Sequence, residues 1–275
     1  MSEFIEKYFI YYAIGMMAIY VIFWRIIPFV RRARQASRGL LSRIYLNQQA
    51  NVTPEQYQRL ATGAIYSEQQ AAYINSLTTG LSSDRVQEIL AGWWHLHNAQ
   101  QAKDKLDYLL HKGFRFYFDK VMEAYDAPSP EQQEQIIIKG FDRVDAKYAE
   151  DTQKAYSQLS NLKETWEELV VNDIIKNRTD LDHYRNVGWD CGRLSFVSRL
   201  CYDAQYITEA EAWEYINQAH QLAVDHFDSW QDYAKSYVIG RAMWGGTNNA
   251  NEDVIAIAEY LLREPNSPWV QFSLK

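Results

Sequence analysis

Residues 208–227 read TEAEAWEYINQAHQLAVDHF, and this stretch decides the fold class. Thr208 is followed three residues later by Glu211, which is the capping-box pattern that begins many helices. Behind it, apolar residues recur at the helical period along one face: Ala212, Trp213, Ile216, Ala219, Ala223 and Phe227. The stretch therefore predicts an amphipathic helix that buries one face in a core.

Similar start signals recur along the rest of the chain. Thr53 and Ser129 each precede a proline at the first helical position and a glutamine at the third, and Ser229 precedes Asp232 in a related pattern. Helices are predicted at 54–72, 83–94, 99–111, 114–126, 131–158, 162–177, 181–204, 209–227, 230–244 and 252–263. The chain has only 12 Gly and 6 Pro, and no strand-length run alternates apolar and polar residues. An all-α fold is therefore expected.

The N-terminus carries a long apolar segment. Tyr8–Trp24 contains no charge, and the apolar run continues past Arg25 to Val30, which is long enough for a helix to span a bilayer. The basic cluster Arg31–Arg34 follows directly. A cleaved signal peptide is the alternative, but it would place basic residues before the apolar run and a small-residue cleavage site after it. We expect a single uncleaved transmembrane helix, with residues 8–30 in contact with the membrane.

The charge distribution sets the expected orientation. The basic cluster after the span places the following residues in the cytoplasm and the N-terminus outside, in a bacterial inner membrane. Residues 1–48 are then the anchor with a basic juxtamembrane helix, and residues 49–275 are a multi-helix cytoplasmic domain, divisible into lobes 49–127 and 128–275. Residues 1–45 carry a balance of +5 within a chain of net charge −7, so the remainder carries −12. Such an acidic domain would repel nucleic acid.

Two stretches resemble a known family. The first lies between Thr53 and Arg115 and contains TPEQYQRLATGAIYSEQ, SLTTGL, GWWHL and LDYLLHKGFR. The second lies between Val187 and Trp244 and contains VGWDCGRLSFVSRLCYDAQYITEAEAW and FDSWQDYAKSYVIGRAMW. Their order and spacing resemble the bacterial family called domain of unknown function 1266, which has enterobacterial members, over about residues 53–245.

The most characteristic elements of this resemblance are Trp-Asp-x-x-Arg and Ser-Trp followed by Gly-Arg-x-x-Trp. They correspond here to Trp189, Asp190, Arg193, Ser229, Trp230, Gly240, Arg241 and Trp244. One departure is Phe114, which stands where the family pattern has a histidine after Gly113. The resemblance supports a helical fold and implies no activity, because the family is defined without one.

Asp190, Arg193 and Arg241 are charged residues in apolar surroundings. Asp190 and Arg193 are three apart and share a helix face. Because buried charges are normally paired, we expect Asp190 to pair with Arg241, with Arg193 as the reserve partner, and so to join helix 181–204 to helix 230–244. The alternative is a pocket in which both arginines hold a carboxylate or phosphate. The candidate cluster, binding or structural, is Trp189, Asp190, Arg193, Ser229, Trp230, Arg241 and Trp244.

Other reactive side chains indicate no specific chemistry. The cysteines Cys191 and Cys201 are ten apart in one helical pattern, which excludes a disulfide and indicates reduced core thiols. The histidines lack the spacing of a metal site, and the acidic residues between 131 and 176 resemble solvated helix faces. Ser229 is best explained as a helix N-cap. No metal, cofactor or catalytic residue is therefore predicted.

Two functions remain open. The first is a membrane-anchored interaction or regulatory module that binds a protein partner without turnover. The alternative is an enzyme or binding protein for an anionic small molecule, with Asp190 as base and Arg193 and Arg241 as anion ligands. The sequence favours the first, because no motif has catalytic geometry. Whether Asp190 and an arginine are mutually satisfied and inaccessible would discriminate between the two.

Overall fold

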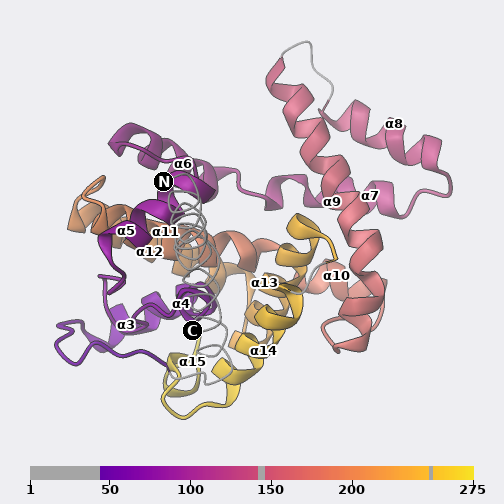
Figure 1. Ribbon diagram of the computed structural model, residues 1–275. Coiled ribbons are helices and arrows are strands. Elements are labelled where there is room, and N and C mark those ends of the chain that lie inside the picture. The colour runs from indigo at the N-terminus through magenta and orange to yellow at the C-terminus, as the bar shows by residue number, and fades with distance from the viewer. Residues whose placement is uncertain (1–43, 142–145, 248–249) are drawn as a thin grey trace, which may run out of the picture. The chain divides into compact units, whose positions relative to one another are not determined.

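The computed structural model describes residues 44–141, 146–247 and 250–275, and these residues form helices and no strand (Figure 1). This confirms the all-α prediction. The helices are α3 (Pro54–Leu60), α4 (Ala64–Gln70), α5 (Ser83–Gln87), α6 (Ala99–His111), α7 (Phe118–Tyr125), α8 (Pro130–Phe141), α9 (Ala146–Val171), α10 (Arg178–Tyr184), α11 (Val187–Asp203), α12 (Glu209–His226), α13 (Trp230–Gly245), α14 (Ala250–Arg263) and α15 (Pro268–Gln271). Short helical turns at η2 (Ala61–Gly63), η3 (Glu88–Trp93) and η4 (Arg115–Tyr117) lie between some of them.

The predicted helix starts are confirmed by their hydrogen bonds. Complete capping boxes begin α3 at Thr53 and α12 at Thr208. The Ser229 hydroxyl accepts from the backbone N–H of Asp232 at 3.1 Å and caps α13. The Ser129 hydroxyl accepts from the N–H of Gln132 at 3.3 Å and starts α8. These signals are readable in the sequence because both partners lie within one helical turn.

Several predicted boundaries are wrong. The predicted helix 131–158 is not one element, because α8 ends at Phe141 and α9 begins at Ala146. The expected break between helices 131–158 and 162–177 does not exist, since α9 runs from Ala146 to Val171 without interruption. The predicted helix 181–204 is two helices, because Arg185 adopts a φ of 55° between α10 and α11. A non-glycine residue in the left-handed region ends a helix, and nothing in the residue types around Arg185 announces it.

Helix α11 is the centre of residues Ile44–Lys275, which form one compact unit. Every residue from Val187 to Cys201 is buried, and α11 packs against α6, α12 and α13. Two glycines allow the closest of these contacts. A Cβ at Gly188 would lie 2.8 Å from the Tyr233 carbonyl oxygen, and one at Gly240 would lie 2.3 Å from the Trp189 Cβ. Glycine is therefore required on both helices where α11 crosses α13.

The remaining helices cover this centre and extend from it. Helices α7, α8 and α9 pack on one another, and Figure 1 shows them together at one end of the unit. The Ala127-Pro128-Ser129 link connects α7 to α8 inside this unit. The two apolar cores both contain α11 side chains, Trp189 and Cys191 in one and Leu194 and Phe196 in the other.

The predicted membrane anchor lies outside the described residues. Residues 1–43 contain the expected span 8–30 and the basic cluster that follows it. Among the helices of residues 44–141, 146–247 and 250–275, none combines the length and apolar character that crossing a bilayer requires.

Candidate functional site

Asp190 is completely buried, and the protein itself supplies hydrogen-bond donors to both of its carboxylate oxygens. Its Oδ1 accepts from the Phe114 backbone N–H at 3.0 Å, and its Oδ2 accepts from the Arg115 backbone N–H at 2.9 Å. The Arg115 guanidinium donates to Oδ2 at 3.1 Å, and the Arg193 guanidinium donates to Oδ1. The carboxylate thus binds the start of η4 to α11 and is neutralised by two arginines.

The turn that Asp190 holds requires glycine at position 113. Gly113 has a φ of 61°, and a Cβ there would lie 2.2 Å from Asp190 Oδ2 and 2.4 Å from Arg115 Nη1. The next residue, Phe114, contributes its backbone N–H to Asp190 and its carbonyl to Gln158 Nε2 at 2.9 Å. Both of these hydrogen bonds use the backbone of position 114, so they do not depend on its side-chain type.

Arg193 lies in an aromatic enclosure. Its guanidinium carbon is 4.9 Å from the ring centre of Trp189, 5.8 Å from that of Trp94 and 5.9 Å from that of Phe114. The side chain is 10% exposed, and its Nε also donates to the Trp189 carbonyl at 3.3 Å. The guanidinium stacks on aromatic faces and pairs with Asp190, so few of its N–H groups are left to bind a ligand.

The expected ion pair between Asp190 and Arg241 is wrong. Asp190 pairs with Arg115 and with Arg193, the reserve partner. Arg241 instead lies over the Trp244 ring, with its guanidinium carbon 5.0 Å from the ring centre. Burial lowers the pKa of Arg241, while the nearby Tyr237 and Glu168 oppose that change. The α11–α13 contact is formed by glycine and aromatic packing, including Trp189 against Tyr237 at 5.0 Å.

The predicted cluster separates into two places. Ser229 and Trp230 begin α13, whereas Arg241 and Trp244 lie near its end, about 20 Å away along the axis at 1.5 Å per residue. Trp230 stacks on Trp269 with ring centres 5.3 Å apart, and its Nε1 donates to the Phe272 carbonyl at 2.9 Å. Trp189 contacts both Arg193 and Trp244, and Trp244 contacts Arg241, whereas Ser229 and Trp230 lie at the other end of α13.

Two buried charged groups were missed by the sequence reasoning. Arg199 is 0% exposed, and its guanidinium donates to Ser67 Oγ at 2.8 Å and to the carbonyls of Tyr73, Leu77 and Thr78. Burial lowers its pKa to about 10. The sequence feature that could have indicated this buried charge is an arginine within the largely apolar run Phe196–Cys201. Arg199 holds the irregular segment between α4 and α5 on the core.

Asp151 is the second, and it corrects the expectation that the acidic residues of 131–176 are solvated. It is 3% exposed, and both its oxygens accept from Lys112 Nζ at 2.7 Å. The Tyr117 hydroxyl donates to Oδ1 at 2.6 Å. Burial alone would raise the pKa of Asp151, but the hydrogen bonds and the Lys112 charge outweigh it and lower the pKa. This contact fixes α9 to the end of α6.

The thiols are free and buried, as predicted. Burial raises the pKa of both, to about 12 for Cys201, so neither is a thiolate near neutral pH. Within the described ranges 44–141, 146–247 and 250–275, no three His, Cys, Asp or Glu side chains are grouped to hold a metal ion.

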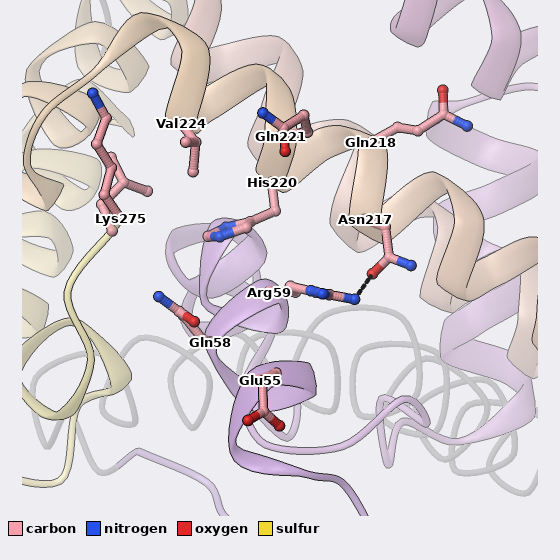
Figure 2. Close-up of a pocket in the computed structure, with 10 residues that line it drawn as sticks. Glu55, Gln58, Arg59, Asn217, Gln218, His220, Gln221, Val224 and Lys275 are labelled. Carbon is pink, nitrogen blue, oxygen red and sulfur yellow. Dashed lines mark hydrogen bonds between the residues drawn. The ribbon is translucent and has the colours of Figure 1, made fainter.

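A pocket of about 540 Å³ lies between α3, α12 and the C-terminal segment. It is lined by Glu55, Gln58, Arg59, Asn217, Gln218, His220, Gln221, Val224, Leu274 and Lys275. Figure 2 shows Arg59 reaching from α3 to Asn217, with His220 of α12 beside it. The Arg59 Nη1 donates to Asn217 Oδ1 at 2.9 Å.

His220 is held in this pocket by Thr62. Its Nδ1 lies 3.2 Å from Thr62 Oγ1. Burial lowers the pKa of the imidazole to about 4, and the Arg59 charge contributes to the same direction. The ring is therefore neutral near pH 7. The pocket thus combines a guanidinium, a neutral imidazole and several amides, which are groups that bind polar ligands. Sequence reasoning did not find it, since α3 and α12 are far apart in the chain.

A family model described as "Protein of unknown function (DUF1266)" matches residues 89–274. The match includes C-terminal residues that the resemblance left out. It begins inside the first stretch, so TPEQYQRLATGAIYSEQ and SLTTGL lie outside it. No curated protein and no solved structure matches the chain. Because the model covers more than half of the sequence, the chain belongs to the DUF1266 family.

Proposed function

We propose that this chain is a membrane-tethered helical module that acts by binding a partner protein, without turnover. The proposal that the chain acts without turnover rests on the burial and hydrogen bonding of Asp190. Both of its oxygens are occupied by two backbone N–H groups and two guanidiniums, and it is 0% exposed. A carboxylate in this position supports the fold and has no free lone pair facing solvent for proton abstraction.

The alternative assigns an anionic substrate to Asp190, Arg193 and Arg241. Its geometry is unfavourable, because Arg193 is already neutralised by Asp190 and enclosed by three aromatic rings. Arg241 lies over the Trp244 ring on α13, whereas Asp190 is on α11 and binds the start of η4. These contacts favour a structural role for the Asp190 cluster and therefore favour the interaction module over the enzyme.

The tether is proposed from the sequence of residues 8–30 and the basic cluster after it. We propose a single pass in a bacterial inner membrane, with the N-terminus outside and the helical domain in the cytoplasm. A reporter active only in the periplasm, fused after Lys275, should give no signal, and one active only in the cytoplasm should give signal. The reverse pattern would refute the orientation. Replacing Arg31, Arg32 and Arg34 with glutamine should weaken the preference for this membrane orientation.

Partner binding is tested with the full chain in its membrane. The chain is crosslinked in situ, solubilised and captured, and the captured proteins are identified by mass spectrometry. A protein recovered with the full chain but not with residues 1–43 alone would support the proposal. Equal recovery with both would assign the interaction to the tether, and recovery of nothing above the 1–43 control would contradict a protein partner.

A further inference from the structure

The pocket between α3 and α12 has the size and the lining of a site for a small polar molecule. Its volume of about 540 Å³ falls in the range of metabolite sites. Val224 and Leu274 contribute apolar side chains, and the other lining residues carry amides, charges or, at His220, a neutral imidazole. Because most of the lining side chains carry polar groups, the chemistry favours a hydrophilic occupant.

Arg59 gives this pocket its charge preference. Its side chain is partly buried, and its recorded partner is the neutral amide oxygen of Asn217. Among the described residues, no carboxylate forms an ion pair with Arg59, whereas Arg85, Arg178 and Arg185 each have one. A partly buried guanidinium normally has a counter-charge, and it offers a planar fork that matches carboxylate or phosphate oxygens.

The other charged groups of the pocket leave that preference intact. Lys275 is paired with Asp228 outside the lining. Glu55 lies one helical turn before Arg59 and interacts with its charge, but Glu55 is exposed to solvent and forms no ion pair with Arg59 within hydrogen-bond distance (Figure 2). Gln58 and Gln221 use their Nε2 groups on Ser273 and Asp225. The guanidinium of Arg59 is therefore the group with unused charged donors.

His220 lies against the same space and is built to respond to an anion. Its Nδ1 is taken by Thr62, and its other ring nitrogen has no hydrogen-bond partner among the described residues. Burial and the positive charge of Arg59 hold it neutral, with a pKa of about 4. An anion on Arg59 would cancel one of these two causes, so the imidazole would gain proton affinity when the pocket fills.

We infer that this pocket binds a small hydrophilic organic anion, whose carboxylate or phosphate group lies between Arg59 and His220. The inference is independent of the membrane tether and of a protein partner. It also differs from the anion pocket considered around Asp190, because it uses none of those residues.

The test is calorimetric titration of the full chain with inorganic phosphate and with malonate. Saturable binding of either is expected, and the probe that binds more tightly assigns the ligand to phosphates or carboxylates. Arg59→Gln should weaken binding by about 10- to 100-fold, as expected for loss of a charge-assisted hydrogen bond. Arg263→Gln is the matched control, because this exposed arginine lies on α14 outside the pocket, and it should bind like the wild type.

Protonation provides a second readout. Sulfate is the probe here, because it does not titrate in this range. When sulfate binds near pH 5.5, the protein should take up a fraction of a proton at His220, because this pH lies between the pKa of about 4 in the free protein and the higher pKa with the anion bound. Measurement in two buffers of different ionisation enthalpy detects this uptake. His220→Gln should abolish the uptake while retaining part of the affinity.

Several results would overturn the inference. One is no saturable binding up to about 10 mM, where a site with a Kd of about 1 mM would be nearly saturated. Another is an equal loss of affinity in Arg59→Gln and Arg263→Gln, which would indicate general surface charge. Wild-type binding without proton uptake near pH 5.5 would place the anion away from His220. Circular dichroism establishes that each variant is folded, and Arg59→Lys, which retains the charge but loses the fork, replaces Arg59→Gln if the latter unfolds.

Discussion

Substituting Asp190 with alanine should destabilise the domain far more than removing any exposed acidic residue. The substitution leaves the backbone N–H groups of Phe114 and Arg115 without an acceptor inside the protein. It also leaves the guanidiniums of Arg115 and Arg193 without their counter-charge. Removing one member of a buried pair costs about 3–5 kcal/mol, and each buried donor left unsatisfied costs about 1–3 kcal/mol. Relaxation reduces the sum, so we expect a loss of about 4 kcal/mol or more.

The assay is thermal unfolding of the purified chain, followed by far-ultraviolet circular dichroism. For a domain of this size, 1 kcal/mol corresponds to about 2–4 °C, so the Tm should fall by about 8–16 °C. Asp119→Ala is the control, because its ion pair with Arg185 is at the surface, where such pairs contribute about 0–1 kcal/mol. If the Tm of Asp190→Ala lies within about 2 °C of the Tm of Asp119→Ala, the contacts of Asp190 do not stabilise the fold. A stable Asp190→Asn protein that lost its biological effect would instead favour the anion-pocket alternative.

Three further predictions follow from buried groups. Arg199→Met should lower the free energy of unfolding by about 3 kcal/mol, because the carbonyls of the segment between α4 and α5 lose their donor. The same change should make that segment more sensitive to proteolysis. Unchanged proteolysis would show that the segment keeps its conformation without Arg199. Gly113→Ala should lower the Tm, owing to its φ of 61° and the 2.2 Å approach of Asp190, whereas Gly92→Ala, which meets nothing within 4 Å, should not. Burial lowers the pKa of His220 in the folded chain to about 4, against 6.5 for an exposed histidine, so the unfolded state binds more protons between these two pH values. The domain should therefore lose stability as pH falls through that window, and the fall of Tm with pH should be shallower in His220→Gln.

The sequence predicted most reliably those features whose partners lie within one helical turn. Thr53, Thr208 and Ser229 each cap a helix through the residue three positions later, so residue type and spacing were sufficient. Break positions were less predictable. The φ of Arg185 that separates α10 from α11 depends on surrounding packing, and neither its own type nor its neighbours' types indicate it.

The sequence also predicted that Asp190, Arg193 and Arg241 are buried, because charges within apolar helical patterns have no other location. It did not predict their partners. Phe114 and Arg115 lie about 75 positions before Asp190, and no local pattern joins a carboxylate to a backbone N–H at that separation. For the same reason Asp151 was assigned to a solvated face, although Lys112 and Tyr117 enclose it.

The helical class, the helix starts and the burial of the charged residues in α11 and α13 were thus determined by the sequence itself, since capping and amphipathic period are local properties. The tertiary structure alone decided which groups meet. It joins the α6–η4 turn to Asp190, the α4–α5 segment to Arg199, and Arg59 of α3 to His220 of α12. These contacts depend on how helices distant in the chain pack together, and packing is a property of the whole core that no single stretch of sequence contains.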